Sequence, residues 1–334
     1  MNVASLEWST RWPAAIAWLI ASALGLTALD TRAQADFPNR PIRIIVPYST
    51  GTGSDALART VAQGITDKTG KPVVVENRAG GGSLIGTLAV AKSPPDGYTL
   101  LIAANPMVIV PAGQSQPQYL PTRDFVPVAK VGVIPLVLAV SPSLKIGSLR
   151  EFIAYAKAHP GKLSYGSSGA GTSSQQEMES FKQALGIDVK EVPYKSTAQA
   201  MTDLIGGTLD AFPAVVPLVA QHIQSGRAVG LAVFDTQRSR LLANIPSVSE
   251  QLEGSAYIPT PVWYGFVAPA GTPPPIVERL SEMINAAMDT DAAAERLTGL
   301  GAQRIKVSNE QFAADLKREF EKSGELAKRL GTYQ

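Results

Sequence analysis

The chain has 334 residues, of which 45% are hydrophobic and 17% charged, with 30 Lys and Arg against 28 Asp and Glu. This length accommodates about two domains, and a net charge of +2 is too small to indicate a protein that binds nucleic acid. The absence of cysteine excludes disulfides, thiolate metal sites and cysteine nucleophiles. The only histidines are His159 and His222, so most metal sites and general-base mechanisms lack the residues they need, and no cofactor is expected.

An apolar segment near the start of the chain predicts a secretory signal peptide. Residues 13–29 are almost all apolar, Arg11 precedes them, and the small-x-small sequence Ala33-Gln34-Ala35 follows. Cleavage after Ala35 would leave residues 36–334 as the exported chain. An uncleaved membrane anchor is the alternative, although the segment is shorter than the about 20 residues that a membrane-spanning helix needs.

The next part of the chain alternates between strand and helix patterns, which predicts a sheet with helices on both faces. Strands are expected at 41–47, 71–76 and 98–103, and helices at 54–69 and 84–92.

The same alternation continues further along the chain. Strands are expected at 133–140, 163–167, 188–193, 209–213 and 228–234. Helices between them are expected to begin at three capping boxes, in which a serine is followed three residues later by Glu or Gln. These are Ser148 with Glu151, Ser173 with Gln176, and Ser196 with Gln199.

The C-terminal part is expected to form one more strand and two helices. The strand at 262–268 follows a Pro- and Ser-rich segment, and its Trp263 and Tyr264 are expected in the core. The last helix should begin at Ser308, and the charge-rich stretch 310–329 should be its solvated face.

These helices have no partner except the first sheet, so the chain is expected to return to its first domain. We therefore predict an α/β fold of two lobes, each with a parallel or mixed sheet. Residues 36–135 plus 240–334 would form lobe 1, and residues 136–239 lobe 2, with a ligand cleft between them.

A glycine-rich turn after the first strand partly matches the dinucleotide-binding fingerprint. Gly51-x-Gly53-x-x-Ala56 opens a helix, and Glu76 ends the next strand. However, residues 47–50 separate the strand from the first glycine, and Asp55 places a negative charge where a pyrophosphate would bind. The loop suits a single carboxylate held by backbone N–H groups. A plain strand-to-helix turn capped by Asp55 is the structural alternative.

Two further loops combine glycine with hydroxyl side chains, at 79–83 and 167–174. Glycine lets the backbone approach a ligand closely, and hydroxyl groups both donate and accept hydrogen bonds. If both loops lie at the ends of their sheets, they would face one cleft from its two sides.

An enzyme would need a nucleophile and a base, and the chain offers neither in a recognisable pattern. Ser167 and Ser168 do not fit Gly-x-Ser-x-Gly, and neither histidine has metal-ligand spacing. Lys195 is better explained as a lysine at the rim of a cleft than as a Schiff-base residue. We expect no catalysis, and a secreted hydrolase is the less favoured alternative.

Six segments in this order resemble the Bug family, the TctC-like solute-binding proteins of tripartite tricarboxylate transporters. They are 37–48, 73–78, 95–101, 163–174, 192–195 and 268–273, and the resemblance covers residues 37–332. It implies a monomeric, two-lobed periplasmic protein that closes like a hinged clamp on a small carboxylated solute, a di- or tricarboxylate or an aromatic acid. The implied partner is a membrane permease, and a membrane sensor to which the ligand is presented is the alternative.

The resemblance also implies ligand contacts, position by position, in the loops of both lobes. In lobe 1 these are Tyr48, Ser49, Thr50, Thr52, Gly53, Ser54, Asp55, Ser83, Leu84 and Asn105. In lobe 2 these are Ser168, Gly169, Gly171, Thr172, Ser173, Tyr194, Lys195, Pro213 and Ala214. Relatives usually carry Asn where this chain has Leu84, and often Asp at about Ala214. These departures shift the expected ligand from an amino acid toward a carboxylate with an apolar or aromatic body.

Overall fold

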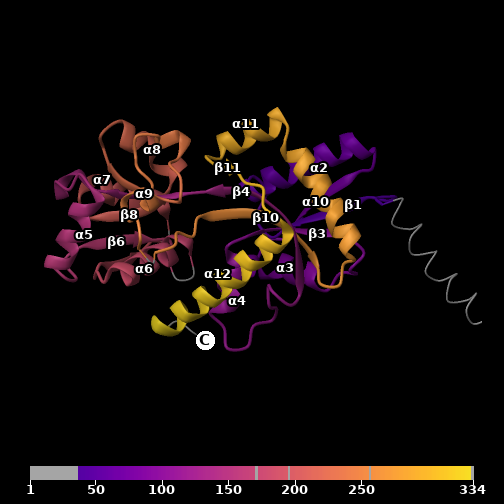
Figure 1. The fold of residues 1–334 in the computed structure, drawn as a ribbon, viewed down its shortest axis with the longest axis horizontal. Coiled ribbons are helices and arrows are strands. Elements are labelled where there is room, and N and C mark those ends of the chain that lie inside the picture. Colours follow the sequence, from indigo (N-terminus) through magenta and orange to yellow (C-terminus); the bar gives the residue numbers. More distant parts are fainter. Residues whose placement is uncertain (1–36, 170–171, 195, 256, 332–334) are drawn as a thin grey trace, which may run out of the picture. The chain divides into compact units, whose positions relative to one another are not determined.

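A computed structural model describes residues 37–169, 172–194, 196–255 and 257–331 of the chain (Figure 1). The chain divides into two units, residues 1–39 and 40–334, and every element named below belongs to the second. The predicted signal segment and its cleavage site lie outside the described residues. Within the described ranges, no helix is both long and apolar enough to cross a membrane.

The first sheet has six strands in the order β11-β4-β10-β3-β1-β2. Their bounds are β1 (Ile42–Val46), β2 (Val73–Asn77), β3 (Thr99–Ala104), β4 (Phe125–Ile134), β10 (Val262–Pro269) and β11 (Gln303–Arg304). β1 pairs in parallel with β2 and β3, whereas β10 lies antiparallel between β3 and β4. The sheet is therefore mixed, and β10 and β11, from the C-terminal part of the chain, pair with the earlier strands β3 and β4.

The second sheet has five strands in the order β7-β6-β8-β5-β9. Their bounds are β5 (Leu136–Val140), β6 (Ser164–Ser167), β7 (Lys190–Pro193), β8 (Ala211–Val215) and β9 (Val229–Phe234). β6 pairs in parallel with β7 and β8, and β5 pairs antiparallel with β8 and β9.

The single strand predicted at 133–140 is wrong, because this run forms two strands in different sheets. β4 ends at Ile134 in the first sheet, and β5 begins at Leu136 in the second. Pro135 lies between them, and it has no N–H to donate to a ladder. The apolar run thus carries the chain from one sheet to the other, which hydrophobicity alone does not reveal.

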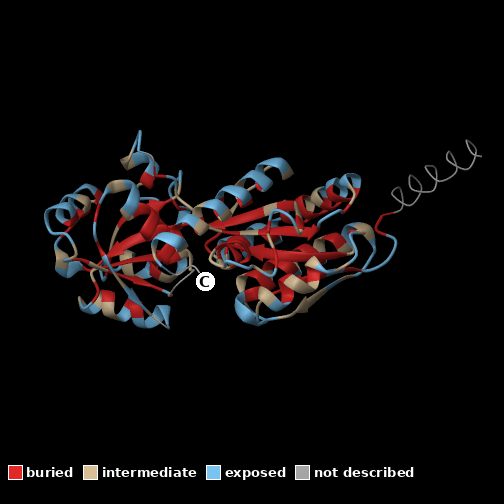
Figure 2. Cartoon of the chain, turned by 90° about the horizontal axis from the view of Figure 1, so that it is seen from below, coloured by how far each residue is buried: buried red, intermediate tan, exposed pale blue. Residues whose placement is uncertain are grey.

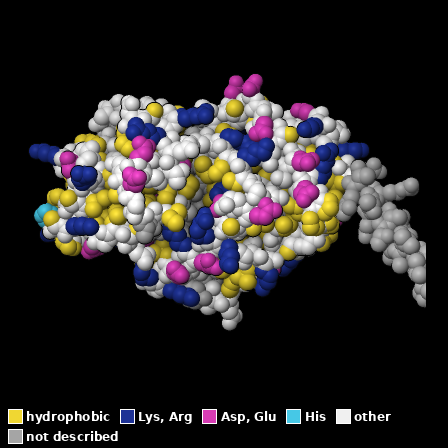
Figure 3. Space-filling model, in the orientation of Figure 1, with side chains coloured by type: hydrophobic (Ala, Val, Ile, Leu, Met, Phe, Trp, Pro, Cys, Tyr) yellow, Lys and Arg dark blue, Asp and Glu magenta, His cyan; other side chains and the backbone are white. Residues whose placement is uncertain are grey.

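Helices flank both sheets, and burial is concentrated in the strands between them (Figure 2). Their bounds are α2 (Gly53–Thr69), α3 (Leu84–Ala91), α4 (Pro106–Ala112), α5 (Leu149–Ala158), α6 (Ser173–Leu185), α7 (Thr197–Gly206), α8 (Val216–Gln224), α9 (Val248–Gln251), α10 (Pro274–Met288), α11 (Asp291–Gly299) and α12 (Asn309–Arg329). Beyond β10 there are thus three described helices, not the two predicted. On the face shown in Figure 3, basic and acidic side chains are interspersed rather than separated by sign.

Two of the predicted capping boxes are wrong in their hydrogen bonds. The cap of α6 is Thr172 rather than Ser173, and its hydroxyl donates to the Gly169 carbonyl at 2.6 Å instead of accepting from the helix. Ser196 does cap α7, but its side chain accepts no hydrogen bond from the helix. At α6 the hydroxyl thus stabilises the preceding loop instead of the helix.

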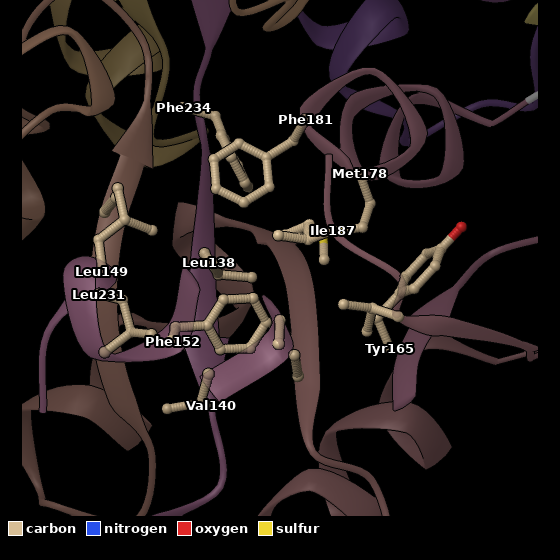
Figure 4. Close-up of a cluster of buried hydrophobic side chains, with 14 of the residues drawn as sticks. Leu138, Val140, Leu149, Phe152, Tyr165, Met178, Phe181, Ile187, Leu231 and Phe234 are labelled. Carbon is tan, nitrogen blue, oxygen red and sulfur yellow. The ribbon is translucent and has the colours of Figure 1, made fainter. Parts of the chain in front are cut away.

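The core of the second sheet is built from aromatic and aliphatic side chains contributed by helices and strands (Figure 4). Phe181 of α6 and Phe234 of β9 meet edge-to-face, with ring centroids 5.4 Å apart. Phe181 also meets the ring of Tyr257 at 5.3 Å. Such pairs fix the angle at which α6 lies on the sheet, because edge-to-face contacts depend on ring orientation.

Gly64 allows α2 and α10 to pack closely, so Gly64→Ala is expected to destabilise the protein. A Cβ at this position would lie 2.6 Å from the Cβ and 2.9 Å from the Cα of Ala287. We expect a loss of about 1–3 kcal/mol in urea unfolding. Gly206→Ala is the control, because a Cβ there meets nothing within 4 Å. Equal midpoints for the two variants would contradict the prediction.

Candidate ligand-binding site

The predicted residues of lobe 1 follow the carboxyl ends of three parallel strands. Residues 47–52 connect β1 to α2, residues 78–83 connect β2 to α3, and Asn105 directly follows β3. Parallel strands end at the same edge of a sheet, and this edge is where ligands bind in many α/β proteins. The amino termini of α2 and α3 also lie at this edge, and helix amino termini attract anions.

The loop between β1 and α2 is held by the buried carboxylate of Asp55. Its Oδ2 accepts from the Gly51 N–H at 3.0 Å, and its Oδ1 accepts from Arg59 at 3.0 Å and from Asn77 at 3.0 Å. Asn77 also donates to the Tyr48 carbonyl at 3.1 Å. Burial alone would raise the pKa of Asp55, but the bonds from Arg59, Gly51 and Asn77 outweigh it and hold that pKa below its ordinary value.

Asp55 therefore fills part of the carboxylate-binding turn predicted from the sequence. The Gly51 N–H is occupied from within the chain, and the cap of α2 is Thr52, whose Oγ1 accepts from the Asp55 N–H at 3.3 Å. Gly51 itself has a φ of +86°, and a Cβ there would meet nothing within 4 Å. The turn is thus pre-formed around an internal carboxylate.

Three hydroxyl groups surround the start of α2 and α3. The Tyr48 Oη and the Ser83 Oγ are buried, and neither has a hydrogen-bond partner among the described residues. Tyr264, which the sequence assigned to the core, brings its Oη to 2.8 Å from where a Cβ on Gly53 would lie. Burial raises the pKa of Tyr48 and of Tyr264. Both phenols therefore stay protonated and can donate.

The loop between β6 and α6 is the corresponding feature of the second sheet. The Ser168 N–H donates to Ser174 Oγ at 3.1 Å, and the Gly169 N–H donates to Ser167 Oγ at 3.0 Å. The Thr172 hydroxyl donates to the Gly169 carbonyl at 2.6 Å, so these bonds are all made within the chain. Ser168 is exposed.

Asn105 is directed into the protein rather than left open to a ligand. It is buried, its Nδ2 donates to Glu319 at 2.8 Å, and its Oδ1 accepts from the Trp263 N–H at 3.0 Å. The amide therefore joins the end of β3 to β10 and α12. Its predicted contact with a ligand remains a prediction.

The remaining predicted residues have mixed environments. Tyr194 donates to Asp203 at 2.9 Å, and burial, followed by Asp203, raises its pKa to about 12. Pro213 and Ala214 are buried in β8. Of the other predicted positions, Ser49 and Thr50 are exposed, Ser54 is buried, and Leu84 and Ser173 are half-buried. Gly171 and Lys195 lie outside the described residues.

Comparison with known proteins assigns the chain to a family. The model of the TctC family, described as "Tripartite tricarboxylate transporter family receptor", matches residues 57–332. The chain belongs to this family. It is also similar to Protein BugT of Bordetella pertussis, with 37% identity over 284 residues, 84% of this chain and 86% of BugT. The resemblance predicted from the sequence is confirmed.

Two solved structures from Rhodopseudomonas palustris share the fold of this TctC-family chain. Rpa4515 with adipate is 30% identical, with a TM-score of 0.67, covering 87% of this chain and 98% of that chain. MatC (Rpa3494) with bound malate is 26% identical, with a TM-score of 0.65, covering 87% of this chain and 100% of that chain. The predicted two-lobed α/β fold, with a sheet in each lobe, is confirmed.

Proposed function

We propose that this TctC-family chain is a periplasmic solute-binding protein that captures a small organic carboxylate in a cleft between its lobes. Family membership carries the proposal, because the matching model describes transporter receptors. The ligands named for two structural relatives, adipate and malate, are both dicarboxylates. Delivery to a membrane permease would follow capture. Uptake of labelled ligand by cells with and without the chain would distinguish a permease partner from a sensor.

The candidate site supports binding by neutral donors. The unpartnered hydroxyls of Tyr48 and Ser83 on one side and the exposed Ser168 on the other are donors that a carboxylate could accept. Leaving a buried hydroxyl unpaired costs about 1–3 kcal/mol, which a ligand oxygen would recover. The proposed ligand would therefore gain most binding free energy from hydrogen bonds to polar groups that have no partner in the folded chain.

Two connections between the sheets support closure by a hinge. The chain passes from β4 to β5 at Pro135, and it returns from β9 to β10 through residues 235–261. A ligand that contacts loops of both sheets makes some of its contacts only in the closed form. These contacts would stabilise the closed form relative to the open one.

The proposed function includes no conversion of the ligand, because Ser167 and His159 both have other hydrogen-bond partners. The Ser167 hydroxyl donates to Glu191 at 2.5 Å, and His159 Nδ1 lies 3.2 Å from the Tyr155 carbonyl. Within the described ranges, therefore, neither group forms a serine–histidine pair. A binding protein would return its ligand chemically unchanged.

The proposal is tested by titration calorimetry and thermal shift with adipate, malate, benzoate, glutamate and aspartate. A specific ligand raises the melting temperature because it binds only the folded state. We expect a di- or aromatic carboxylate to bind at micromolar concentration, about −8 kcal/mol. No binding by any carboxylate would contradict the function, and preference for glutamate or aspartate would contradict the predicted ligand class.

Ser168→Ala is expected to weaken binding of the ligand found in this screen about fivefold to tenfold, because one hydrogen bond is worth about 1 kcal/mol. Ser249→Ala, which changes an exposed serine of α9, is the matched control and should bind normally. Nuclear magnetic resonance of the released ligand checks its structure. Conversion of the ligand that Ser168→Ala abolishes would instead support the secreted hydrolase.

A further inference from the structure

A cavity of about 490 Å³ lies against Glu319 and Trp263, the residues that hold Asn105. It is formed by the carboxyl half of α6, residues 257–261, the start of β10, and α12. None of the predicted ligand residues lines it. Its lining consists of Lys130, Ser180, Gln183, Ala184, Tyr257, Ile258, Pro259, Thr260, Pro261, Trp263, Asp315, Arg318, Glu319 and Lys322.

Three basic side chains, Lys130, Arg318 and Lys322, line this cavity together with two acidic ones, Asp315 and Glu319. Lys130 and Arg318 share one carboxylate, that of Asp315, at 2.8 and 2.6 Å. Two cations on one anion leave an excess of positive charge at the wall.

Lys322 adds a third cation that has only neutral partners. Its ammonium donates to the Ile258 carbonyl at 3.1 Å and to Thr260 Oγ1 at 3.0 Å. Among the described residues, no carboxylate lies within ion-pair distance of it. Burial lowers the pKa of Lys322, and the fields of Glu177 and Glu319 oppose that change. A half-buried ammonium whose hydrogen-bond partners are neutral is partly desolvated, and a bound anion would offset that cost.

Glu319 does not cancel this charge fully. It is 6% exposed and accepts from Asn105 and from the Trp263 indole at 2.7 Å. Burial raises its pKa to about 7, so part of the population is neutral at neutral pH. Both of its oxygens are used inside the protein.

The other wall of the cavity is apolar. Ile258 is 59% exposed, and it lines the cavity together with Tyr257, Pro261 and Trp263. A cavity with an apolar wall and a few converging polar groups is typical of a small-molecule site. Excess positive charge selects anions among the molecules that fit it.

We propose that this cavity is a second binding site, for a small organic acid with one carboxylate and a compact apolar body. The carboxylate binds the Lys322 ammonium, and the apolar body packs on Ile258, Pro261 and Trp263. The site draws on α6, which covers the second sheet, and on β10 and α12 of the first. Gln176 of α6 already donates to Ser323 of α12, so a ligand here adds a further link between the same helices.

Tryptophan fluorescence reports on this site directly. Of the four tryptophans in the chain, Trp8, Trp12 and Trp18 precede the described residues, and Trp263 lines the cavity. The full chain with those three changed to Phe therefore has a single tryptophan. We titrate it with cyclohexanecarboxylate, which does not absorb at the excitation wavelength, and expect a saturable change at millimolar concentration or below.

Lys322→Met should weaken this response at least about tenfold, the effect expected of losing a charged hydrogen bond. Lys317→Met is the matched control, because Lys317 lies on the same helix with its side chain 70% exposed. Since Lys322 is half-buried, Ile258→Asp provides a second variant, which places a repelling charge at an exposed position and removes no core side chain. Each variant's thermal unfolding is measured alongside.

Three outcomes would overturn the proposal. One is an unchanged response in a folded Lys322→Met or Ile258→Asp variant. The second is equal binding of cyclohexanol, which would show that charge plays no part. The third is loss of the response in Ser168→Ala but not in Lys322→Met, which would place the acid in the other site. Because calorimetry on the Ser168 variant tests the proposed function separately, failure of one does not imply failure of the other.

Discussion

Asp55→Ala is expected to lower the free energy of unfolding by about 3 kcal/mol, because three hydrogen bonds worth about 1 kcal/mol each lose their acceptor. The Asp55 side chain is 5% exposed, whereas its partner Arg59 is 52% exposed and can turn to water. The substitution leaves the Gly51 N–H and the Asn77 amide without their acceptor. Urea unfolding at neutral pH measures the loss.

Acid titration separates this carboxylate from others on the same helix. The pKa of Asp55 is lowered in the folded state, so its contribution is present above the unfolded pKa of about 4. It is lost as the pH falls through the lower folded value. Asp55→Ala should therefore remove part of the acid sensitivity of the wild-type chain.

Asp67→Ala is the matched control for Asp55. Asp67 is an exposed residue of α2 whose carboxylate accepts from Gln63 at 2.7 Å. An exposed pair of this kind contributes less than about 0.5 kcal/mol. If the two variants lost equal stability, Asp55 would not be what holds the loop between β1 and α2.

The features that the sequence predicts well are local ones. Ser148 and Ser308 accept from the helix N–H groups three residues on, and Gly70 and Gly186 end their helices in the left-handed conformation. Each of these depends on residues within one helical turn, and short-range chemistry of this kind leaves a readable pattern. Runs of apolar residues likewise predicted the strands of both sheets, except for the first part of β4 and the two-residue β11.

What the sequence could not predict depends on contacts between distant residues. The stretch 310–329 was expected to be a solvated face, yet Glu319 is buried against Asn105, 214 residues earlier in the chain. A single glutamate among exposed charges carries no signal of burial, because its partners come from other strands. Tyr264 was likewise assigned to the core, and its position beside Gly53 depends on β10 inserting between β3 and β4.

The buried carboxylates of Glu177 and Glu319 are expected to lower the stability of the folded chain as the pH rises from about 5 to 8. Glu177 of α6 is fully buried, accepts from the Tyr257 hydroxyl, and accepts from the Thr260 N–H at 2.8 Å. Burial raises its pKa, like that of Glu319, to about 7. Lys322 opposes the rise for both, whereas Asp235 and Glu319 add to it for Glu177.

The direction of the effect follows from where the protons are bound. Between an unfolded pKa of about 4.3 and a folded pKa of about 7, the folded chain binds more protons than the unfolded chain. Stability is therefore fully present below the unfolded pKa and falls as the pH rises through the folded one. A change of this size corresponds to about 4 kcal/mol for each group as an upper value.

Glu319→Gln is expected to reduce this pH dependence by about half, because the amide does not titrate and Glu177 still does. At pH 5 the variant should be about 1 kcal/mol less stable than wild type, since an amide can accept only one of the two bonds from Asn105 and Trp263. At pH 8 the order should reverse, because the wild-type chain then carries a buried charge. Urea unfolding at several pH values measures both ends of the range.

Glu321→Gln controls for the loss of a charge on α12, because the Glu321 side chain is 60% exposed and ion-paired only at 4.0 Å. It should leave the slope of stability against pH unchanged. The same slope in Glu319→Gln as in wild type would show that the carboxylate stays ionised in the folded chain, held by Asn105, Trp263 and the neighbouring lysines. The excess positive charge at the cavity would then be smaller, so the pH series also bears on how tightly that cavity can hold an anion.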